Sequence, residues 1–263
     1  MTGGPGPAVA GLSEHGADRR LAVSRRQVVH PLQVAGLSEH GADRRLAVSQ
    51  QQVVGLSEHV AKRRLGAVGI AVPAGLPVPA EEAAATADRL GFPVVVKATG
   101  AVHKTETGGV VAGIEDPGEV AATARRLAGD GGTVMVEACV TGAVAELLVS
   151  VRSAPPVGML LTLGAGGILA ELLDDTASLL LPAPADDVLA ALRRLRIWPL
   201  LTGHRGRPAA AVGAVLDTVA ALGALVRDDR SIIEIEINPL IVTNEAAVAA
   251  DALMLVAEPL DHE

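Results

Sequence analysis

Aromatic residues and cysteine are almost absent from this sequence. Its 263 residues include one phenylalanine, one tryptophan, no tyrosine and a single cysteine, Cys139. One cysteine cannot form a disulfide within the chain, which favours a reducing compartment. Single-stranded nucleic acids are bound largely by stacking bases on aromatic side chains. The scarcity of aromatics and a net charge of -8 therefore argue against nucleic acid as a partner.

Long apolar runs are also missing. No stretch approaches the roughly 18 uninterrupted apolar residues that a membrane helix needs. The N-terminus carries glycine and proline where a secretory signal would have basic residues and then an apolar segment. We therefore expect a soluble, cytoplasmic protein without a membrane partner. An apolar content of 49% is ample for the core of one large domain or two small ones.

Charge is distributed unevenly along the chain and marks a boundary. Residues 1–65 contain nine Lys and Arg against five acidic residues, a balance of +4, whereas residues 66–263 contain 13 against 25, a balance of -12. The basic part is repetitive. Residues 11–24 recur letter for letter at 36–49, and the same sequence begins again at Gly55.

Each copy offers a serine as a helix N-cap. The first two copies carry Gly16 and Gly41 where the third has Val60, and glycine weakens a helix. Only the third copy therefore predicts a helix. The irregular spacing and weak apolar content do not fit a stacked repeat protein. Residues 1–54 are thus either a duplicated, mobile extension or a basic arm that docks on a partner or an anionic surface.

From residue 56 onward, helical and strand patterns alternate. Helices are predicted at about 57–66, 79–90, 117–127, 185–196 and 209–227. Strands are predicted at about 92–97, 110–112, 132–137, 144–151, 157–163, 232–237, 240–243 and 246–250. This order predicts an α/β (α+β) fold in which a mixed sheet is covered by helices.

The segment 103–109 sets a histidine, a lysine and a carboxylate beside a glycine pair. The preceding apolar strand ends at Lys97, and Val110 begins the strand that leaves the loop. A lysine at a strand end can neutralise phosphate oxygens. The strand, the lysine, the glycine loop and the returning strand therefore predict a hairpin that handles nucleotides.

These motifs, in this order, resemble the ATP-grasp domain of the NDP-forming acyl-CoA synthetase superfamily. The similarity covers residues 56–257 and lies in 56–59, 69–73, 91–97, 103–109, 164–171, 199–206 and 236–240. It is to the beta subunit of ADP-forming acetyl-CoA synthetase and, more distantly, of succinyl-CoA synthetase. The resemblance implies an ATP-grasp fold of two lobes, an N-terminal lobe at 55–135 and a C-terminal lobe at 136–257, after an extension at 1–54 and before a tail at 258–263.

The resemblance also implies a set of nucleotide-binding and catalytic residues. Residues implied to bind ATP or ADP are Lys97, Lys104, Gly108, Gly109, Glu137, the backbone at Val140, and Glu146. His103 is implied to carry phosphate. Neutral imidazole suits that task because it is nucleophilic near its unperturbed pKa of about 6.5. A plainer interpretation is a loop histidine that only forms hydrogen bonds.

Two residues near the C-terminus, Asn238 and Asp251, look like the family's magnesium ligands. Magnesium prefers hard oxygen ligands and keeps several waters, so an amide oxygen and a carboxylate suffice beside phosphate. An Asn-Pro pair alone is more often a turn. Glu171, Glu236 and Arg205 are weaker candidates for positioning the metal's waters or the phosphate.

The implied activity is that of an ADP-forming acyl-CoA synthetase. Acyl-CoA, ADP and phosphate would give acid, CoA and ATP reversibly, with phosphate passing through His103, and a CoA-binding, alpha-type subunit or domain would be the partner. Residues 152–158 and 179–181 depart from the family pattern, which has Asp-Pro-x-Phe-Gly-Pro and an arginine there. The alternative is a divergent paralogue that binds ATP as a regulatory subunit. An ATP-grasp ligase joining a carboxylate to an amine would leave the loop histidine without a purpose.

Overall fold

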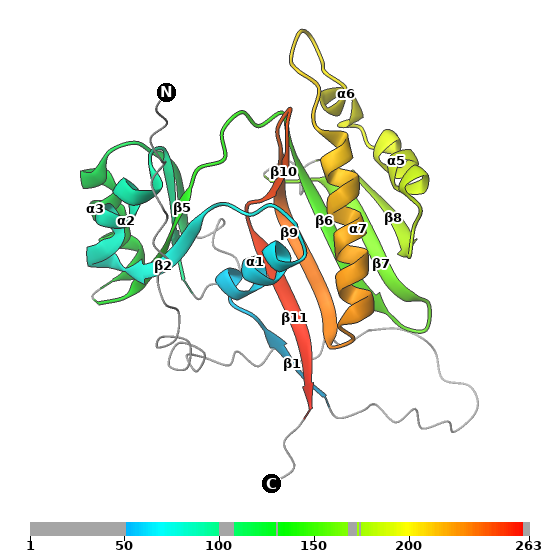
Figure 1. Cartoon of the computed structure of the whole chain (residues 1–263), viewed down its shortest axis with the longest axis horizontal. Helices are drawn as coiled ribbons and strands as arrows, with labels where there is room; N and C mark the ends of the chain where they lie inside the picture. The colour runs from blue at the N-terminus through cyan, green and yellow to red at the C-terminus, as the bar shows by residue number, and fades with distance from the viewer. Residues whose placement is uncertain (1–50, 100–107, 130, 168–172, 174, 260–263) are drawn as a thin grey trace, which may run out of the picture.

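The protein folds around two antiparallel sheets, each with its own apolar core (Figure 1). The structure, a computed structural model, describes residues 51–99, 108–129, 131–167, 173 and 175–259. Every pairing between named strands in these ranges is antiparallel. Mixed helix and sheet content confirms the predicted fold class.

The smaller sheet is built from strands between residues 75 and 138. Its strands are β2 (Gly75–Pro79), β3 (Val94–Ala98), β4 (Val110–Ile114) and β5 (Thr133–Ala138), in the order β2-β5-β3-β4. A short 3-10 turn, η1 (Ala80–Glu82), leads into α2 (Ala83–Leu90), and α3 (Pro117–Ala128) follows β4. Both helices pack their buried faces on this sheet to form the smaller core.

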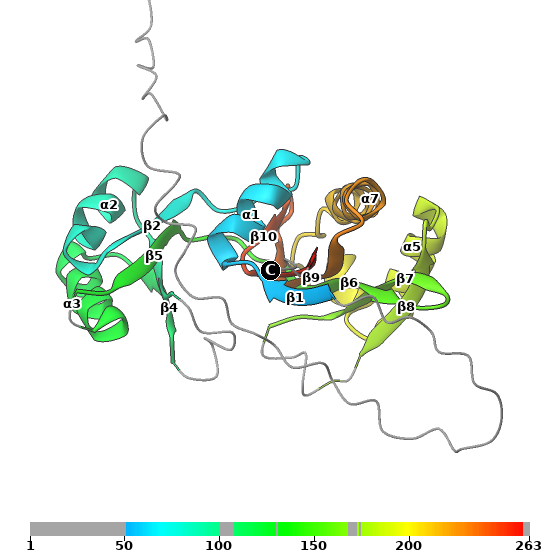
Figure 2. The same cartoon turned by 90° about the horizontal axis from the view of Figure 1, so that it is seen from below.

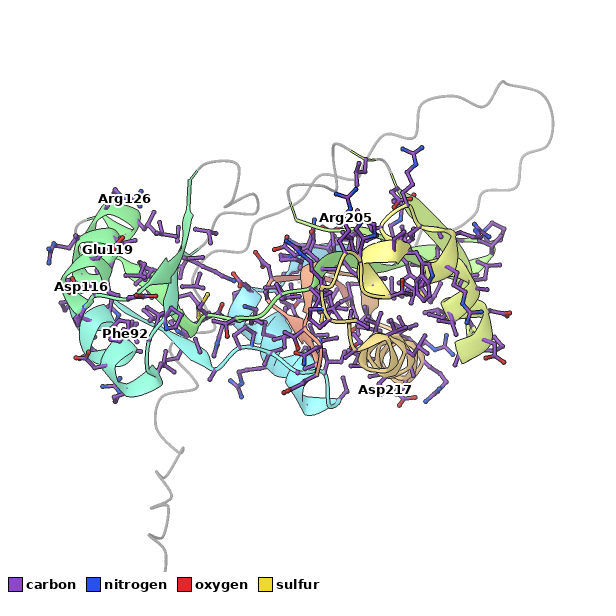
Figure 3. All side chains as sticks on the ribbon, turned by 90° about the horizontal axis from the view of Figure 1, so that it is seen from above. Phe92, Asp116, Glu119, Arg126, Arg205 and Asp217 are labelled. Carbon is purple, nitrogen blue, oxygen red and sulfur yellow. The ribbon has the colours of Figure 1, made fainter. Side chains whose placement is uncertain are left out.

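Local signals explain where α3 begins and ends. Asp116 accepts a hydrogen bond from the backbone N–H of Glu119 at 2.9 Å, and Pro117 occupies the first turn. Both features are typical of a helix N-terminus. The helix ends at Gly129, whose φ of 65° lies in the left-handed region that glycine adopts readily. Figure 3 shows Asp116 and Glu119 together at the outer end of the smaller lobe.

In the described part of the chain the larger sheet has seven strands. They are β1 (Gln51–Gly55), β6 (Ala145–Ala154), β7 (Gly158–Ala165), β8 (Thr176–Leu181), β9 (Ile232–Val242), β10 (Ala247–Ala249) and β11 (Ala252–Pro259). The order is β1-β11-β9-β6-β7-β8, and β10 pairs with β9. The helices that complete this lobe are α1 (Glu58–Ala67), α5 (Ala185–Arg194), α6 (Trp198–Leu201) and α7 (Val212–Asp228).

Figure 2 shows α1, α5 and α7 on one face of the larger sheet. Alternate residues of the central strands, such as Ile235, Ile237 and Val149, point into the core beneath these helices and are fully buried. The intervening residues, such as Glu236 and Ser150, are half-buried on the opposite face. This second face, which we call the open face, carries no helix of the described part of the chain.

The lobes differ in three ways from the boundaries predicted from sequence. Residues 51–54, predicted as the end of the extension, form most of β1, which pairs with β11 from Gln51↔Pro259 to Gly55↔Leu255. Helix α1, predicted to lie in the N-terminal lobe, places Ala61 and Leu65 in the core of the larger lobe. The boundary predicted at residue 135 also moves, because β5 continues to Ala138. The last crossing of the chain from the smaller to the larger sheet therefore lies at 139–144.

None of the helices in the described ranges is long and apolar enough to cross a membrane.

Candidate nucleotide site

Four buried charged residues meet where the two lobes join. Glu58 and Lys62 come from α1 of the larger lobe, and Lys97 and Glu137 from β3 and β5 of the smaller one. All four are less than 10% exposed. We call this set the charge ring.

Each carboxylate of the charge ring contacts both ammonium groups. Lys62 Nζ lies 2.8 Å from Glu58 Oε1 and 2.6 Å from Glu137 Oε1. Lys97 Nζ lies 2.7 Å from Glu58 Oε1 and 3.0 Å from Glu137 Oε2. Buried charges are tolerated only when they are paired and hydrogen-bonded, and this alternation satisfies that requirement with no net charge.

Neighbouring carboxylates determine the ionisation of Lys97. Burial on its own would lower the pKa of this ammonium, but the carboxylates of Glu58, Glu137 and Asp251 outweigh it and raise the pKa above its ordinary value. Lys97 therefore stays positively charged at any physiological pH. A permanent positive charge is what a phosphate contact requires.

Close packing of β2 against β5 fixes Glu137 within the ring. Gly75 pairs with Glu137 across these strands. A Cβ added at Gly75 would lie 2.5 Å from the carbonyl oxygen of Val136 and 2.6 Å from Cγ of Glu137. Only glycine therefore fits opposite Glu137 without moving it.

Lys97 also reaches the larger lobe directly. Its Nζ donates a hydrogen bond to the carbonyl oxygen of Ala250, 2.6 Å away. The backbone N–H of Ala250 in turn donates to the carbonyl oxygen of Pro239 at 3.1 Å. Lys97 is thus hydrogen-bonded to the residue that precedes Asp251, and that residue is in turn hydrogen-bonded to Pro239, which follows Asn238.

Asn238 and Asp251 are neighbours across the larger sheet. Ala252 pairs with Ile237 in the β9–β11 register, so Asp251 and Asn238 follow on at the end of that pairing. Asn238 Oδ1 accepts a hydrogen bond from the backbone N–H of Gly167 at 2.9 Å, and Asp251 Oδ1 accepts one from Ala252 N at 2.7 Å. Both side chains are half-buried.

These two residues fit a magnesium ion by the chemistry of their donors. Each offers oxygen atoms, and an amide or carboxylate oxygen can accept more than the one backbone hydrogen bond named above. The described residues contain no group of three or more His, Cys, Asp or Glu that could hold a metal. A fully protein-built cage is therefore not formed by them, whereas a site completed by phosphate and water is compatible with what is present.

Glu146 and Asn238 both contact Gly167, which lies in the glycine turn after β7. The carboxylate of Glu146 contacts the position where a side chain at Gly167 would begin, and its carbonyl oxygen accepts from Gly166 N at 2.8 Å. Glu146 is exposed. Its position beside the glycine turn after β7 leaves this exposed carboxylate next to Asn238, which accepts a hydrogen bond from the same turn.

A polar row crosses the open face next to this pair. Glu236 pairs with Ser150, Ser150 with Thr162, and Thr162 with Ser178 on successive strands. The hydroxyl groups of Thr162 and Ser178 are 3.3 Å apart. Because residues opposite one another in antiparallel strands share a face, Glu236, a weaker candidate from sequence, lies on the open face two residues from Asn238.

The remaining predicted residues are more scattered. Ala98 N donates to the carbonyl oxygen of Gly109 at 2.7 Å, and Lys97 pairs with Val110, so the predicted hairpin is formed and returns its glycines beside Lys97. Val140 lies half-buried in the crossing between the lobes. Arg205 is exposed in the loop between α6 and α7, on the larger lobe (Figure 3). His103, Lys104 and Glu171 lie outside the described residues.

Sequence reasoning missed Glu58 and Lys62 as site residues. They are four positions apart in α1, which is the ordinary spacing of an exposed helical ion pair. The pattern gave no indication that both would be buried. The one usable signal was that Glu58 stands in a stretch, 56–59, that carries the family resemblance.

This fold and this site define a nucleotide-binding protein of the ATP-grasp type. The family model for the ATP-grasp domain matches residues 47–256, and the chain belongs to this family. A trans-feruloyl-CoA synthase from an unknown prokaryotic organism is 34% identical over 76% of this chain. The beta subunit of ADP-forming acetate–CoA ligase I from Pyrococcus furiosus is 29% identical over 69% of this chain and 86% of its own length.

Solved structures lead to the same group of proteins. The dinucleotide-forming acetyl-coenzyme A synthetase 1 of Candidatus Korarchaeum cryptofilum matches with a TM-score of 0.69 and 26% identity, over 77% of this chain and 93% of that one. Another structure of that enzyme contains coenzyme A and Mg-AMPPCP, with a phosphohistidine segment pointing towards the nucleotide-binding site. Several of the curated relatives are ADP-forming acetate–CoA ligases. The chain spans 30% of the length of the feruloyl-CoA synthase.

Proposed function

We propose that this chain is the nucleotide-binding subunit of an ADP-forming acyl-CoA synthetase. One observation carries the proposal: the buried ammonium of Lys97 meets the carbonyl of Ala250, directly beside the neighbouring oxygen ligands Asp251 and Asn238. A phosphate-neutralising lysine and a magnesium-type oxygen pair converge at the junction of the two lobes. That convergence is what binding a nucleoside di- or triphosphate with magnesium needs.

The side chains then divide the work of holding the nucleotide. Lys97 neutralises phosphate oxygens, and Asn238 and Asp251 hold magnesium. Glu236, two residues from Asn238 on the same strand, binds the waters of the metal, and Glu146 beside Gly167 contacts the nucleotide. Bound magnesium would offset the negative charge on the transferring phosphoryl group. Because both oxygens of Glu137 already accept from Lys62, we assign the adenine contact to the backbone that follows, up to Val140. Lys104, Gly108, Gly109, Glu171 and Arg205 complete the proposed phosphate surroundings.

His103 is the proposed carrier of phosphate. Its neutral imidazole nitrogen attacks the terminal phosphorus of ATP, forming an N–P bond as the bond to the ADP oxygen breaks, and the reverse transfer regenerates ATP. The acyl and CoA chemistry requires a CoA-binding, alpha-type subunit or domain, which is the proposed partner. The relation to separate beta subunits supports this assignment.

Labelling with phosphate tests the carrier role. The chain is incubated with magnesium and ATP labelled in its terminal phosphate, and an acid-labile, base-stable label on the protein is measured. We expect labelling of the wild type, loss of the label in His103→Ala, and unchanged labelling in His204→Ala, which alters an exposed histidine of the α6–α7 loop. Labelling retained by His103→Ala would overturn the carrier role.

The competing function is that of a regulatory subunit which binds ATP without turnover. The departures from the family pattern favour it: residues 152–158 form the end of β6 and the turn into β7, and residues 179–181 form the end of β8. Assaying acyl-CoA formation with and without a CoA-binding subunit separates the two functions. Nucleotide binding without labelling or turnover in either assay would establish the regulatory one.

A further inference from the structure

The two lysines of the charge ring use all their hydrogen-bonding capacity. An ammonium group has three donors and no acceptor. Lys97 Nζ lies within 3.0 Å of three acceptor atoms, one each from Glu58, Glu137 and Ala250. Lys97 therefore has to release at least one of these partners before it can donate to a phosphate.

Lys62 is saturated in a different way. Its three contacts, at 2.6 to 2.9 Å, all go to the carboxylates of Glu58 and Glu137. Lys62 therefore already contacts both carboxylates of the charge ring that Lys97 would leave. If Lys97 turns away, each carboxylate keeps one buried ammonium partner.

We propose that Lys97 has two positions, a resting one in the charge ring and a working one on the nucleotide phosphates, and that Lys62 is the positioning residue that makes the exchange possible. This inference rests on the proposed role of Lys97 in binding phosphate. Glu58 is the resting partner of Lys97, and nucleotide phosphate replaces it. Lys62 remains in place and keeps Glu58 and Glu137 from becoming unneutralised buried carboxylates, which are costly.

The arrangement predicts opposite effects for two single substitutions. Lys62→Met leaves Lys97 as the one ammonium group in the charge ring. When Lys97 then moves to the phosphate, both Glu58 and Glu137 remain buried without a cation, so nucleotide binding weakens. Glu58→Gln removes a charged partner from the resting position of Lys97, so nucleotide binding strengthens. If the charge ring only held the two lobes together, both substitutions would instead weaken nucleotide binding.

The experiment measures the affinity for AMPPCP, a non-hydrolysable ATP analogue, with magnesium by titration calorimetry on the full chain. We expect Lys62→Met to weaken nucleotide binding by about tenfold or more and Glu58→Gln to strengthen it by a few-fold. Changes of about this size are expected when one unit charge is removed at contact distance from another. Lys62→Arg, which keeps the charge, should rescue most of the loss. The double variant, with a neutral ring of Lys97 and Glu137, should return toward wild-type affinity.

Matched controls use an exposed ion pair. Arg227 and Asp228 on α7 lie 3.1 Å apart with side chains 65% and 70% exposed. Arg227→Met and Asp228→Asn remove the same charges without touching the ring, and neither should alter affinity. If Lys62→Met does not fold, Glu58→Gln and the double variant decide the question by the sign of their shifts.

The outcomes separate the two proposals. Opposite shifts with recovery in the double variant support two positions for Lys97. Loss of affinity in both single variants, or no change in either, overturns this inference while wild-type binding still supports the proposed function. Failure of the wild-type chain to bind AMPPCP with magnesium overturns the proposed function and removes the premise of this one.

Discussion

The backbone N–H of Gly167 donates a hydrogen bond to Oδ1 of Asn238, 2.9 Å away. This contact joins the glycine turn after β7 to the middle of β9 and orients the amide of Asn238. Gly167 has a φ of 59°, and the carboxylate of Glu146 occupies the space next to its Cα. A single glycine thus positions a proposed metal ligand and a proposed nucleotide-contacting carboxylate.

Substituting Gly167 by alanine should damage the site more than the fold. The added Cβ collides with the Glu146 carboxylate, and the left-handed backbone costs about 1 kcal/mol. Gly142→Ala is the matched control, because Gly142 has a φ of 72° and open space around it. We expect both variants to lose similar stability in urea unfolding and only Gly167→Ala to lose magnesium–nucleotide affinity in addition. Equal affinities for the two variants would contradict the placement of Glu146.

Removing the Asp251 carboxylate should change the requirement for magnesium. Asp251→Ala deletes one of two proposed oxygen ligands, so the magnesium concentration that gives half-maximal nucleotide binding should rise by about tenfold. The measurement is a magnesium titration at fixed AMPPCP. Asp217→Ala removes an exposed carboxylate on α7 (Figure 3) and should leave the titration unchanged. An unchanged midpoint in Asp251→Ala would show that the metal binds elsewhere.

Core strand β11 can be tested through Met254, which is fully buried. Met254→Ala should lower the free energy of unfolding by about 2–5 kcal/mol, because it removes buried methylene groups and leaves a cavity. Val157, 61% exposed in the β6–β7 turn, provides the control. Val157→Ala should change the unfolding free energy by less than about 0.5 kcal/mol. Urea unfolding of both variants measures the difference, and similar values would argue against a buried β11.

Helix α1 should make stability depend on pH through His59. Burial and the nearby charge of Arg63 lower the pKa of this histidine below its ordinary value. The folded chain therefore binds the proton less readily than the unfolded one, and the free energy of unfolding should fall as pH drops below about 6.5. His59→Gln should flatten the slope between pH 5 and 7 in urea unfolding, whereas His204→Gln at an exposed site should leave it as in the wild type. An unchanged slope in His59→Gln would assign that pH dependence to other groups.

Periodicity predicted most helices and the strands of the central hairpins, since their caps and apolar patterns are local. It divided β9 into two strands, because Asn238-Pro239 has the composition of a turn. In the structure the strand runs through this point, and the pairing of β6 with β9 shifts between Leu147 and Val149. Such a bulge is how a central strand accommodates a proline without a backbone N–H. It arises from pairing with β6, which the sequence of β9 does not contain.

Strands β1, β2, β8 and β11 escaped prediction for a related reason. They lie at sheet edges or pair with segments far away in the chain, as β1 does with β11. The sequence beside them contains no turn motif that would predict those pairings. The charge ring was missed in the same manner. Glu58 and Lys62 look like a surface pair until Lys97 and Glu137 arrive from the other lobe.

The pairing of Gln51 with Pro259 has a bearing on how such a domain can be built into larger proteins. The chain enters and leaves the described fold at adjacent points on one sheet edge (Figure 1). A further domain fused ahead of β1 or behind β11 would depart from nearly the same place. Gene fusion in either order would then place a second domain at a similar distance from the proposed nucleotide site, and separating the two at that junction would leave both cores of the described fold intact.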